Sequence, residues 1–222
     1  MHPERAVLSR GLRLAYLIFA LGTVGILTRL VKSGKTAELD AQVTEALQRK
    51  QNPLFSRVMH MASWAGFPPQ SRTLPLVIPA VMGLFGSRLD ALFQLASWGT
   101  SAISGTLKMI MKRPRPVEGR FRVTKANIGG TSFPSGHVIN YTGVYGMLAY
   151  LVAQRVKNTA VRRSFVGFLV AKIALVGPSR IYLGHHWFTD VVTSYLLGTS
   201  YLLMITSVYR RIRYQGIKGS GV

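Results

Sequence analysis

The sequence predicts an all-α fold, a polytopic membrane helix bundle of about six transmembrane helices with one or two interfacial helices. Two observations carry this prediction. Hydrophobic residues make up 48% of the 222 residues and gather in long runs, and basic residues flank these runs. Runs of this kind suit helices that cross a bilayer. The length fits one bundle, so we expect a single integral membrane domain over residues 1–222.

The first span is expected at Leu14–Leu30, after a basic lead that carries Arg5, Arg10 and Arg13. A charged start followed by an apolar middle is also typical of a signal peptide. However, the residues that follow the run, VKSGK, offer no small-residue cleavage site. We therefore predict an uncleaved membrane helix.

Residues 36–65 differ in character from the spans. Leu39, Val43 and Leu47 recur every four residues among polar neighbours, which predicts an amphipathic helix over Thr36–Lys50. Leu54–Trp64 is interrupted by charged and polar side chains and is a second interfacial candidate. We expect this region to lie along the membrane surface.

Five further apolar stretches complete the predicted bundle: Thr73–Phe85, Leu89–Met111, Val138–Val156, Ser164–Val176 and Trp187–Tyr209. The first of these contains Pro75 and Pro79, which membrane helices tolerate when neighbours satisfy the freed carbonyls.

Six spans put both termini on one side of the membrane, together with the basic loop Lys157–Arg163 and the basic tail that begins at Arg210. The positive-inside rule makes this side the cytoplasm. The loop Pro114–Phe133 and the stretch Ser179–Asp190 then face the other side. We therefore expect a protein of the cytoplasmic (inner) membrane with its active site on the extracytoplasmic face.

The composition limits the kinds of partner, nucleophile and metal site that the chain can have. A net charge of +21 fits nucleic-acid binding or loops that meet anionic lipid, but the basic residues are dispersed over both membrane faces, which favours lipid. The chain has no cysteine, which excludes a thiolate nucleophile and disulfides. Its seven acids are scattered, which argues against a carboxylate-bound metal. We expect neither a metal nor another cofactor.

The stretch Ser179–Asp190 contains the strongest candidates for chemistry. His186 and Asp190 are four residues apart, which on a helix puts both side chains on one face within hydrogen-bonding reach. A carboxylate bonded to one imidazole nitrogen leaves the other free to attack. Arg180 supplies donors suited to phosphate oxygens. His185 is a weaker candidate, since its spacing to Asp190 is one residue too long.

Two other stretches carry polar residues beside predicted spans. Ser135 and Gly136 precede the span at Val138, where a serine can cap the helix and a glycine lets an anion approach its free N–H groups. His137 would stand in the first turn of that helix and face the bound anion. Lys108 and Arg115 belong to a basic cluster at the end of an earlier span, which topology alone could also explain.

Together, Lys108 to Arg115-Pro116, Pro134-Ser135-Gly136-His137 and Ser179-Arg180 to Asp190 resemble the three-part signature of the type 2 phosphatidic acid phosphatase (PAP2) superfamily, in its membrane lipid phosphatase branch. The pattern is a lysine, six residues, then Arg-Pro; next Pro-Ser-Gly-His; and last Ser-Arg, five residues, a histidine, three residues and an aspartate. All three parts match between residues 108 and 190.

The resemblance implies a metal-independent phosphatase with a phosphohistidine intermediate. It makes His186 the nucleophile, Asp190 the residue that orients it, and His137 the general acid. The implied phosphate-binding residues are Lys108, Arg115, Ser135, Gly136 and Arg180.

The expected substrate is a membrane lipid phosphate such as an isoprenyl (undecaprenyl) diphosphate, phosphatidylglycerophosphate or phosphatidate. Two alternatives are a lipid phosphotransferase that uses the same histidine and a non-catalytic lipid-binding or transport protein. Beyond the substrate and the bilayer we expect no nucleic-acid partner, and the sequence does not fix the oligomeric state.

Overall fold

A computed structural model describes residues 3–124 and 130–219, and within them every regular element is a helix. The predicted all-α class is confirmed. The helices are α1 (Pro3–Lys32), α2 (Ala37–Gln48), α3 (Pro53–Ser63), the 3₁₀ turn η1 (Trp64–Gly66), α4 (Gln70–Phe85), α5 (Arg88–Ala96), the 3₁₀ turn η2 (Ser97–Gly99), α6 (Thr100–Met111), α7 (Gly136–Asn140), the π turn η3 (Tyr141–Tyr145), α8 (Gly146–Arg155), α9 (Thr159–Tyr182) and α10 (Phe188–Gly219).

Three described helices contain stretches long and apolar enough to cross a membrane: Arg10–Lys32 in α1, Thr159–Tyr182 in α9 and Phe188–Arg213 in α10. The other predicted spans fall on α4 and on the consecutive helices α5–η2–α6 and α7–η3–α8. Large apolar side chains remain exposed along α1 and α4, including Ile18, Phe19 and Leu84. This exposure suits lipid-facing helices, and the count of six stays a prediction.

The packed centre of the bundle lies between α7–η3–α8, α9 and α10. Val138, Tyr141, Val176 and Val191 belong to one buried cluster that joins these elements. Helix α1 packs against α10 at the edge of the bundle, and Ala20 is its one buried residue among the side chains described. The second and third sequence motifs therefore lie on or beside these inner helices.

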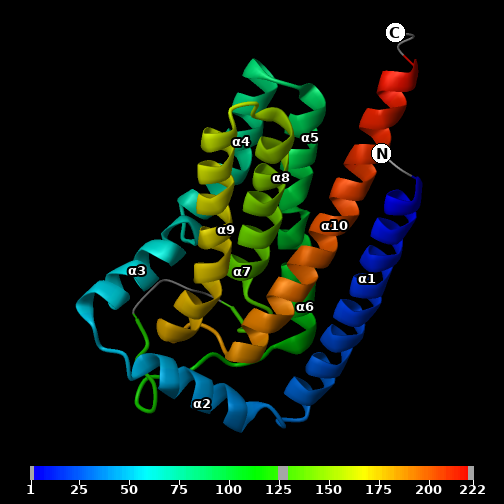
Figure 1. Ribbon diagram of the computed structural model, residues 1–222. Coiled ribbons are helices and arrows are strands. Elements are labelled where there is room, and N and C mark those ends of the chain that lie inside the picture. The colour runs from blue at the N-terminus through cyan, green and yellow to red at the C-terminus, as the bar shows by residue number, and fades with distance from the viewer. Residues whose placement is uncertain (1–2, 125–129, 220–222) are drawn as a thin grey trace.

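Figure 1 shows that α1 begins and α10 ends at the same end of the bundle, as an even number of spans requires. Helices α2 and α3 lie at the opposite end, where α2 crosses the bundle (Figure 1). Leu39 of α2 is 49% exposed, whereas Asp40, Thr44 and Gln48 are buried. Helix α2 thus turns a polar stripe inward, toward the ends of α9 and α10, with which it is in contact.

Candidate active site

The three motifs meet at the end of the bundle that α2 covers. The side chains come from the end of α6 and the loop after it, the start of α7, the end of α9 and the loop after it, and the start of α10. Gly184 makes this meeting possible, because α9 ends at Tyr182 and the chain then reverses through Gly184 at φ +70°. A Cβ at Gly184 would lie 2.3 Å from the carbonyl oxygen of Arg122. A left-handed glycine beyond a helix end is the usual way to make such a reversal.

His186 is buried, and its two ring nitrogens have different partners. Nδ1 lies 2.7 Å from the backbone oxygen of Ser132, an acceptor, so Nδ1 carries the proton. Nε2 lies 3.1 Å from Nη1 of Arg115, which can only donate. The Nε2 lone pair is therefore available, as a nucleophile requires.

Asp190 does not bond directly to His186, contrary to the helical spacing argument. Nδ1 of His186 lies 3.6 Å from Oδ2 of Asp190, because His186 precedes α10 whereas Asp190 lies in its first turn. The carboxylate accepts instead from the Ser132 hydroxyl and, at 2.9 Å, from the backbone N–H of Trp187. The second bond is one half of a capping box. The Ser132 hydroxyl therefore links the two residues, since it donates to Asp190 and lies 3.5 Å from Nδ1 of His186.

Arg113 and Asp40 extend this arrangement. Nη1 of Arg113 lies 2.6 Å from Oδ1 of Asp190, and Nη2 lies 2.6 Å from Oδ2 of Asp40. Asp40 also accepts from the backbone N–H and the hydroxyl of Thr189 at 2.8 and 2.9 Å. Through Asp40, helix α2 is tied to the first turn of α10.

The three predicted phosphate-binding cations converge on the same place. Lys108 donates to the backbone oxygen of Thr131, and Arg115 donates to the backbone oxygens of His185, Gly130 and Thr131. Arg180 is completely buried, and its guanidinium lies over the ring of Phe67, 5.0 Å from the centroid. Each cation thus has a defined position before any ligand binds.

Several buried donors in the site have no partner among the described residues. They are Nε and Nη2 of Arg180, Oγ of Ser135 and Nε2 of His137. Ser135 occupies the N-cap position of α7, but its side chain makes no capping bond, so the predicted cap is wrong. Buried donors left unpaired in one place indicate a site built for an anion that supplies the missing acceptors.

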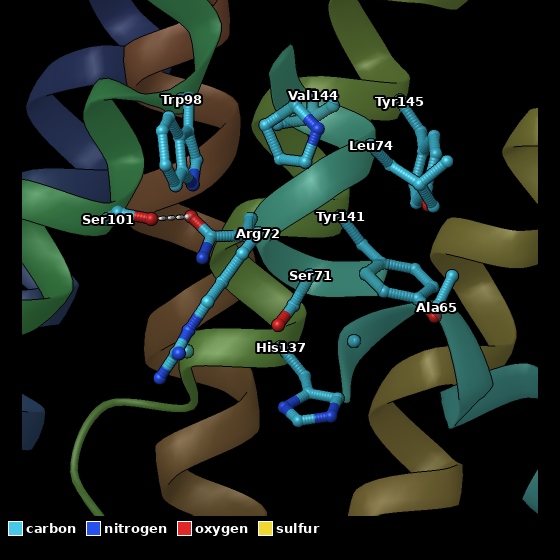
Figure 2. A pocket seen from close by; sticks show the side chains of 14 residues that line it. Ala65, Ser71, Arg72, Leu74, Trp98, Ser101, His137, Tyr141, Val144 and Tyr145 are labelled. Carbon is cyan, nitrogen blue, oxygen red and sulfur yellow. Dashed lines mark hydrogen bonds between the residues drawn. The ribbon is translucent and has the colours of Figure 1, made fainter. Parts of the chain in front are cut away.

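His137 fits against Gly66 and Phe67. A Cβ at Gly66 would lie 2.0 Å from a carbon of the His137 ring, so only glycine leaves room for this imidazole. The Phe67 ring meets His137 edge-on, with centroids 4.9 Å apart. His137 also lines a cavity of about 280 Å³ between η1, α4, α6 and α7 (Figure 2). A proton donor at this wall can reach a leaving group that occupies the cavity.

Burial sets the protonation of the two adjacent histidines in the loop before α10. It lowers the pKa of His186 well below its ordinary value of 6.5, and the positive charge of Arg115 lowers it further. Burial and then Arg180 lower the pKa of His185 to about 3. His185 donates from Nε2 to the backbone oxygen of Thr124 at 2.8 Å and is a structural residue of the loop. Both imidazoles are neutral at neutral pH.

The other basic residues of the loop after α6 have structural contacts. Arg120 pairs with Glu45 of α2 at 2.9 Å, and Arg122 donates to the backbone oxygen of Gln48. These contacts attach the loop to α2. Lys125, which shares the basic character of this loop in the sequence, lies outside the described residues.

Sequence reasoning missed Ser132, Arg113 as a partner of Asp190, and Asp40. The scarcity of acids was the available signal for Asp40, because a buried carboxylate in so basic a chain needs a cation beside it. Across residues 3–124 and 130–219, no three His, Asp or Glu side chains gather as a metal site would require.

Comparison with known proteins agrees with this geometry. A sequence model of the PAP2 superfamily matches residues 89–214. Phosphatidylglycerophosphatase B of Bacillus subtilis (strain 168) is 29% identical over 202 residues, covering 89% of this chain and 94% of the relative. The crystal structure of the transmembrane PAP2 type phosphatidylglycerolphosphate phosphatase from Bacillus subtilis superposes with a TM-score of 0.76 at 25% identity, over 90% of this chain and 96% of that one.

The crystal structure of Aquifex aeolicus LpxE shares the fold, with a TM-score of 0.60 at 16% identity over 76% of this chain and 95% of that one. The family match covers more than half of the present chain and includes all three motifs. This chain is therefore a helical membrane protein that belongs to the PAP2 superfamily.

Proposed function

We propose that this phosphatase removes a phosphate group from a membrane lipid through a phosphohistidine on His186, without a metal ion. The observation that carries the proposal is the free lone pair on Nε2 of His186, held beside buried donors that lack partners. A phosphate at this place would meet a nucleophile and its missing hydrogen-bond donors together.

In the first step, Nε2 of His186 attacks phosphorus while the bond to the leaving oxygen breaks. Lys108, Arg115 and Arg180 neutralise the equatorial oxygens, a task that metal ions perform in many other phosphoryl-transfer enzymes. Ser135 and the backbone of Gly136 bind the same oxygens. His137, in its imidazolium form when the anionic phosphate occupies the site, gives one proton to the leaving oxygen and becomes neutral.

In the second step, water attacks the phosphohistidine and releases inorganic phosphate. His137 accepts the proton of that water, so it ends each cycle as it began. The imidazole of His186 is regenerated with its proton still on Nδ1, where Ser132 holds it. A lipid or sugar hydroxyl in place of water would make the reaction a phosphotransfer.

We place the site at the extracytoplasmic face of the cytoplasmic membrane, where the lipid tail stays in the bilayer while the phosphate reaches His186. The basic termini support this orientation. One candidate substrate is phosphatidylglycerophosphate, after which two of the similar proteins are named. The others are isoprenyl diphosphates such as undecaprenyl diphosphate, and phosphatidate.

The test is phosphate release by the purified protein in detergent with EDTA present. Each candidate lipid is supplied to the wild type and to His186→Ala. We expect release of stoichiometric phosphate from at least one lipid, abolished by the substitution. Activity that requires added Mg²⁺, or that survives in His186→Ala, would contradict the proposal. Transfer of phosphate to a hydroxyl acceptor without free phosphate would identify a phosphotransferase.

A further inference from the structure

The cavity beside His137 has features that a simple apolar channel for a lipid tail would lack. Its apolar wall includes Leu74, Pro75 and Val144. Its polar lining includes Ser71, Arg72, Ser101 and Asn140, and none of its lining residues is an aspartate or a glutamate. The cavity therefore combines one uncompensated cation with neutral hydrogen-bonding groups.

Arg72 is the cation of this cavity. It belongs to the first turn of α4 and is exposed, and its guanidinium makes no hydrogen bond or ion pair with any described residue. Figure 2 shows its side chain running along the cavity, with the guanidinium and the His137 imidazole at the same end of the view. The guanidinium donors of Arg72 are thus available to a ligand in the cavity.

Asn140 adds oriented amide donors. Its side-chain oxygen accepts from the hydroxyls of Thr100 at 2.7 Å and Ser101 at 3.0 Å, and the second of these bonds is drawn in Figure 2. Because two hydroxyl groups donate to the same end of the Asn140 amide, that end is the oxygen and the other end is the NH₂ group. That NH₂ group donates to no described residue, and the Ser71 hydroxyl is likewise without a partner there.

We infer that this cavity is a second anion subsite, which receives a phosphate group carried by the leaving part of the substrate. The inference rests on the proposed function, in which His137 protonates the leaving oxygen from the wall of this cavity. The leaving group must then occupy the cavity, beside Arg72 and Asn140. A guanidinium with neutral donors and no carboxylate matches phosphate oxygens.

The subsite selects a chemical class of substrate. A lipid diphosphate leaves as a lipid monophosphate, and phosphatidylglycerophosphate leaves with a phosphodiester on its glycerol. Both leaving groups carry the second phosphate that Arg72 can bind. Phosphatidate leaves as an uncharged diacylglycerol and offers no such group. The enzyme should therefore prefer substrates with two phosphates to phosphatidate.

The test compares Arg72→Gln with the wild type on phosphatidylglycerophosphate, an isoprenyl diphosphate and phosphatidate. Arg57→Gln is the matched control, since Arg57 is an exposed cation of α3 outside the cavity lining. We expect Arg72→Gln to lower kcat/KM roughly 10- to 100-fold for the two substrates with a second phosphate, the size of a lost hydrogen bond to a charged group. Phosphatidate hydrolysis should change less than about threefold.

Equal losses on all three lipids, or no loss on any, would overturn the subsite. A binding measurement keeps the result separate from that of the proposed function. In His186→Ala, which the proposed function expects to be inactive, phosphatidylglycerol in nanodiscs should bind more tightly than diacylglycerol. Adding Arg72→Gln to that variant should abolish the difference. If that preference is present but His186→Ala still releases phosphate, the subsite stands and the proposed nucleophile fails. If the preference is missing, the subsite fails.

Discussion

The guanidinium of Arg113 bonds to the carboxylate of Asp190, with Nη1 2.6 Å from Oδ1. Its other terminal nitrogen bonds to Asp40 of α2. With two carboxylates as partners, Arg113 differs from the three cations that we propose to bind the phosphate. Arg113 fixes Asp190, which in turn accepts from the Ser132 hydroxyl, so Arg113 is connected to His186, the proposed nucleophile, only through these two residues.

Loss of Arg113 should therefore reduce the rate without reducing affinity. We expect Arg113→Gln to lower kcat about 100-fold, as displacement of a reacting group by a fraction of an ångström can do, with little change in KM. Lys112→Gln is the control, since Lys112 is the neighbouring exposed cation. A rise in KM with unchanged kcat would instead place Arg113 on the phosphate.

Asp190→Asn should lower kcat less than the same substitution does in enzymes whose aspartate bonds directly to the catalytic histidine. Direct contacts of that kind are worth about 10⁴-fold in kcat. Here the Ser132 carbonyl oxygen holds the Nδ1 proton, so the tautomer survives and we expect a loss of roughly 100-fold. Ser132→Ala, which keeps the carbonyl but loses the hydroxyl link, should lose no more than Asp190→Asn. A loss for Asp190→Asn as large as that of His186→Ala would show that the carboxylate itself sets the tautomer.

The protonation of His186 can be observed directly. Burial and Arg115 hold its pKa well below 6.5, so the folded state binds fewer protons than the unfolded state as the pH falls. Stability should therefore decrease as the pH falls below about 6.5, the unfolded value. In ¹⁵N NMR of histidine-labelled protein, the signals absent from His186→Ala should show a protonated Nδ1 and a bare Nε2 at pH 6.5, where half of an unperturbed histidine would be charged. Titration near 6.5 would contradict this environment.

Gly66→Ala tests the role of His137 as general acid. The new methyl group would occupy the position of the imidazole and displace it. We expect lipid hydrolysis to fall about 100-fold, the size of a general-acid contribution. Hydrolysis of p-nitrophenyl phosphate, whose leaving group needs no proton, should fall much less. Gly105→Ala on α6 is the control, because nothing lies within 4 Å of a Cβ there. Equal losses on both substrates would mean that His137 does not protonate the leaving group.

The helices and the motif residues could be predicted because both depend on local sequence. Apolar runs predict α1, α9 and α10, and the motif spacing selects the pair His186 and His137. The packing of α2 was harder to predict. Its apolar residues suggested a helix that faces lipid, whereas its polar residues are buried on the side that contacts α9 and α10. Nothing in the local pattern distinguishes these two uses of one amphipathic helix.

The bonds around Asp190 could not be predicted from spacing. Arg113 and Asp40 are 73 residues apart, and Ser132 and Asp190 are 58 apart, so the fold alone brings them together. The i, i+4 argument for His186 and Asp190 also required one continuous helix, but α10 begins at Phe188. Because the helix begins two residues beyond His186, the imidazole is held by the Ser132 carbonyl oxygen and not by the Asp190 carboxylate.

The most direct measurement is to trap the phosphoenzyme. The protein is mixed in EDTA with lipid labelled with ³²P in its terminal phosphate, quenched in alkali, and mapped by mass spectrometry. We predict an acid-labile, alkali-stable phosphate on Nε2 of His186, absent from His186→Ala and present in Arg113→Gln at a lower rate of formation. A phosphoenzyme that persists in His186→Ala, or turnover of lipid with no phosphohistidine at any quench time, would contradict the account.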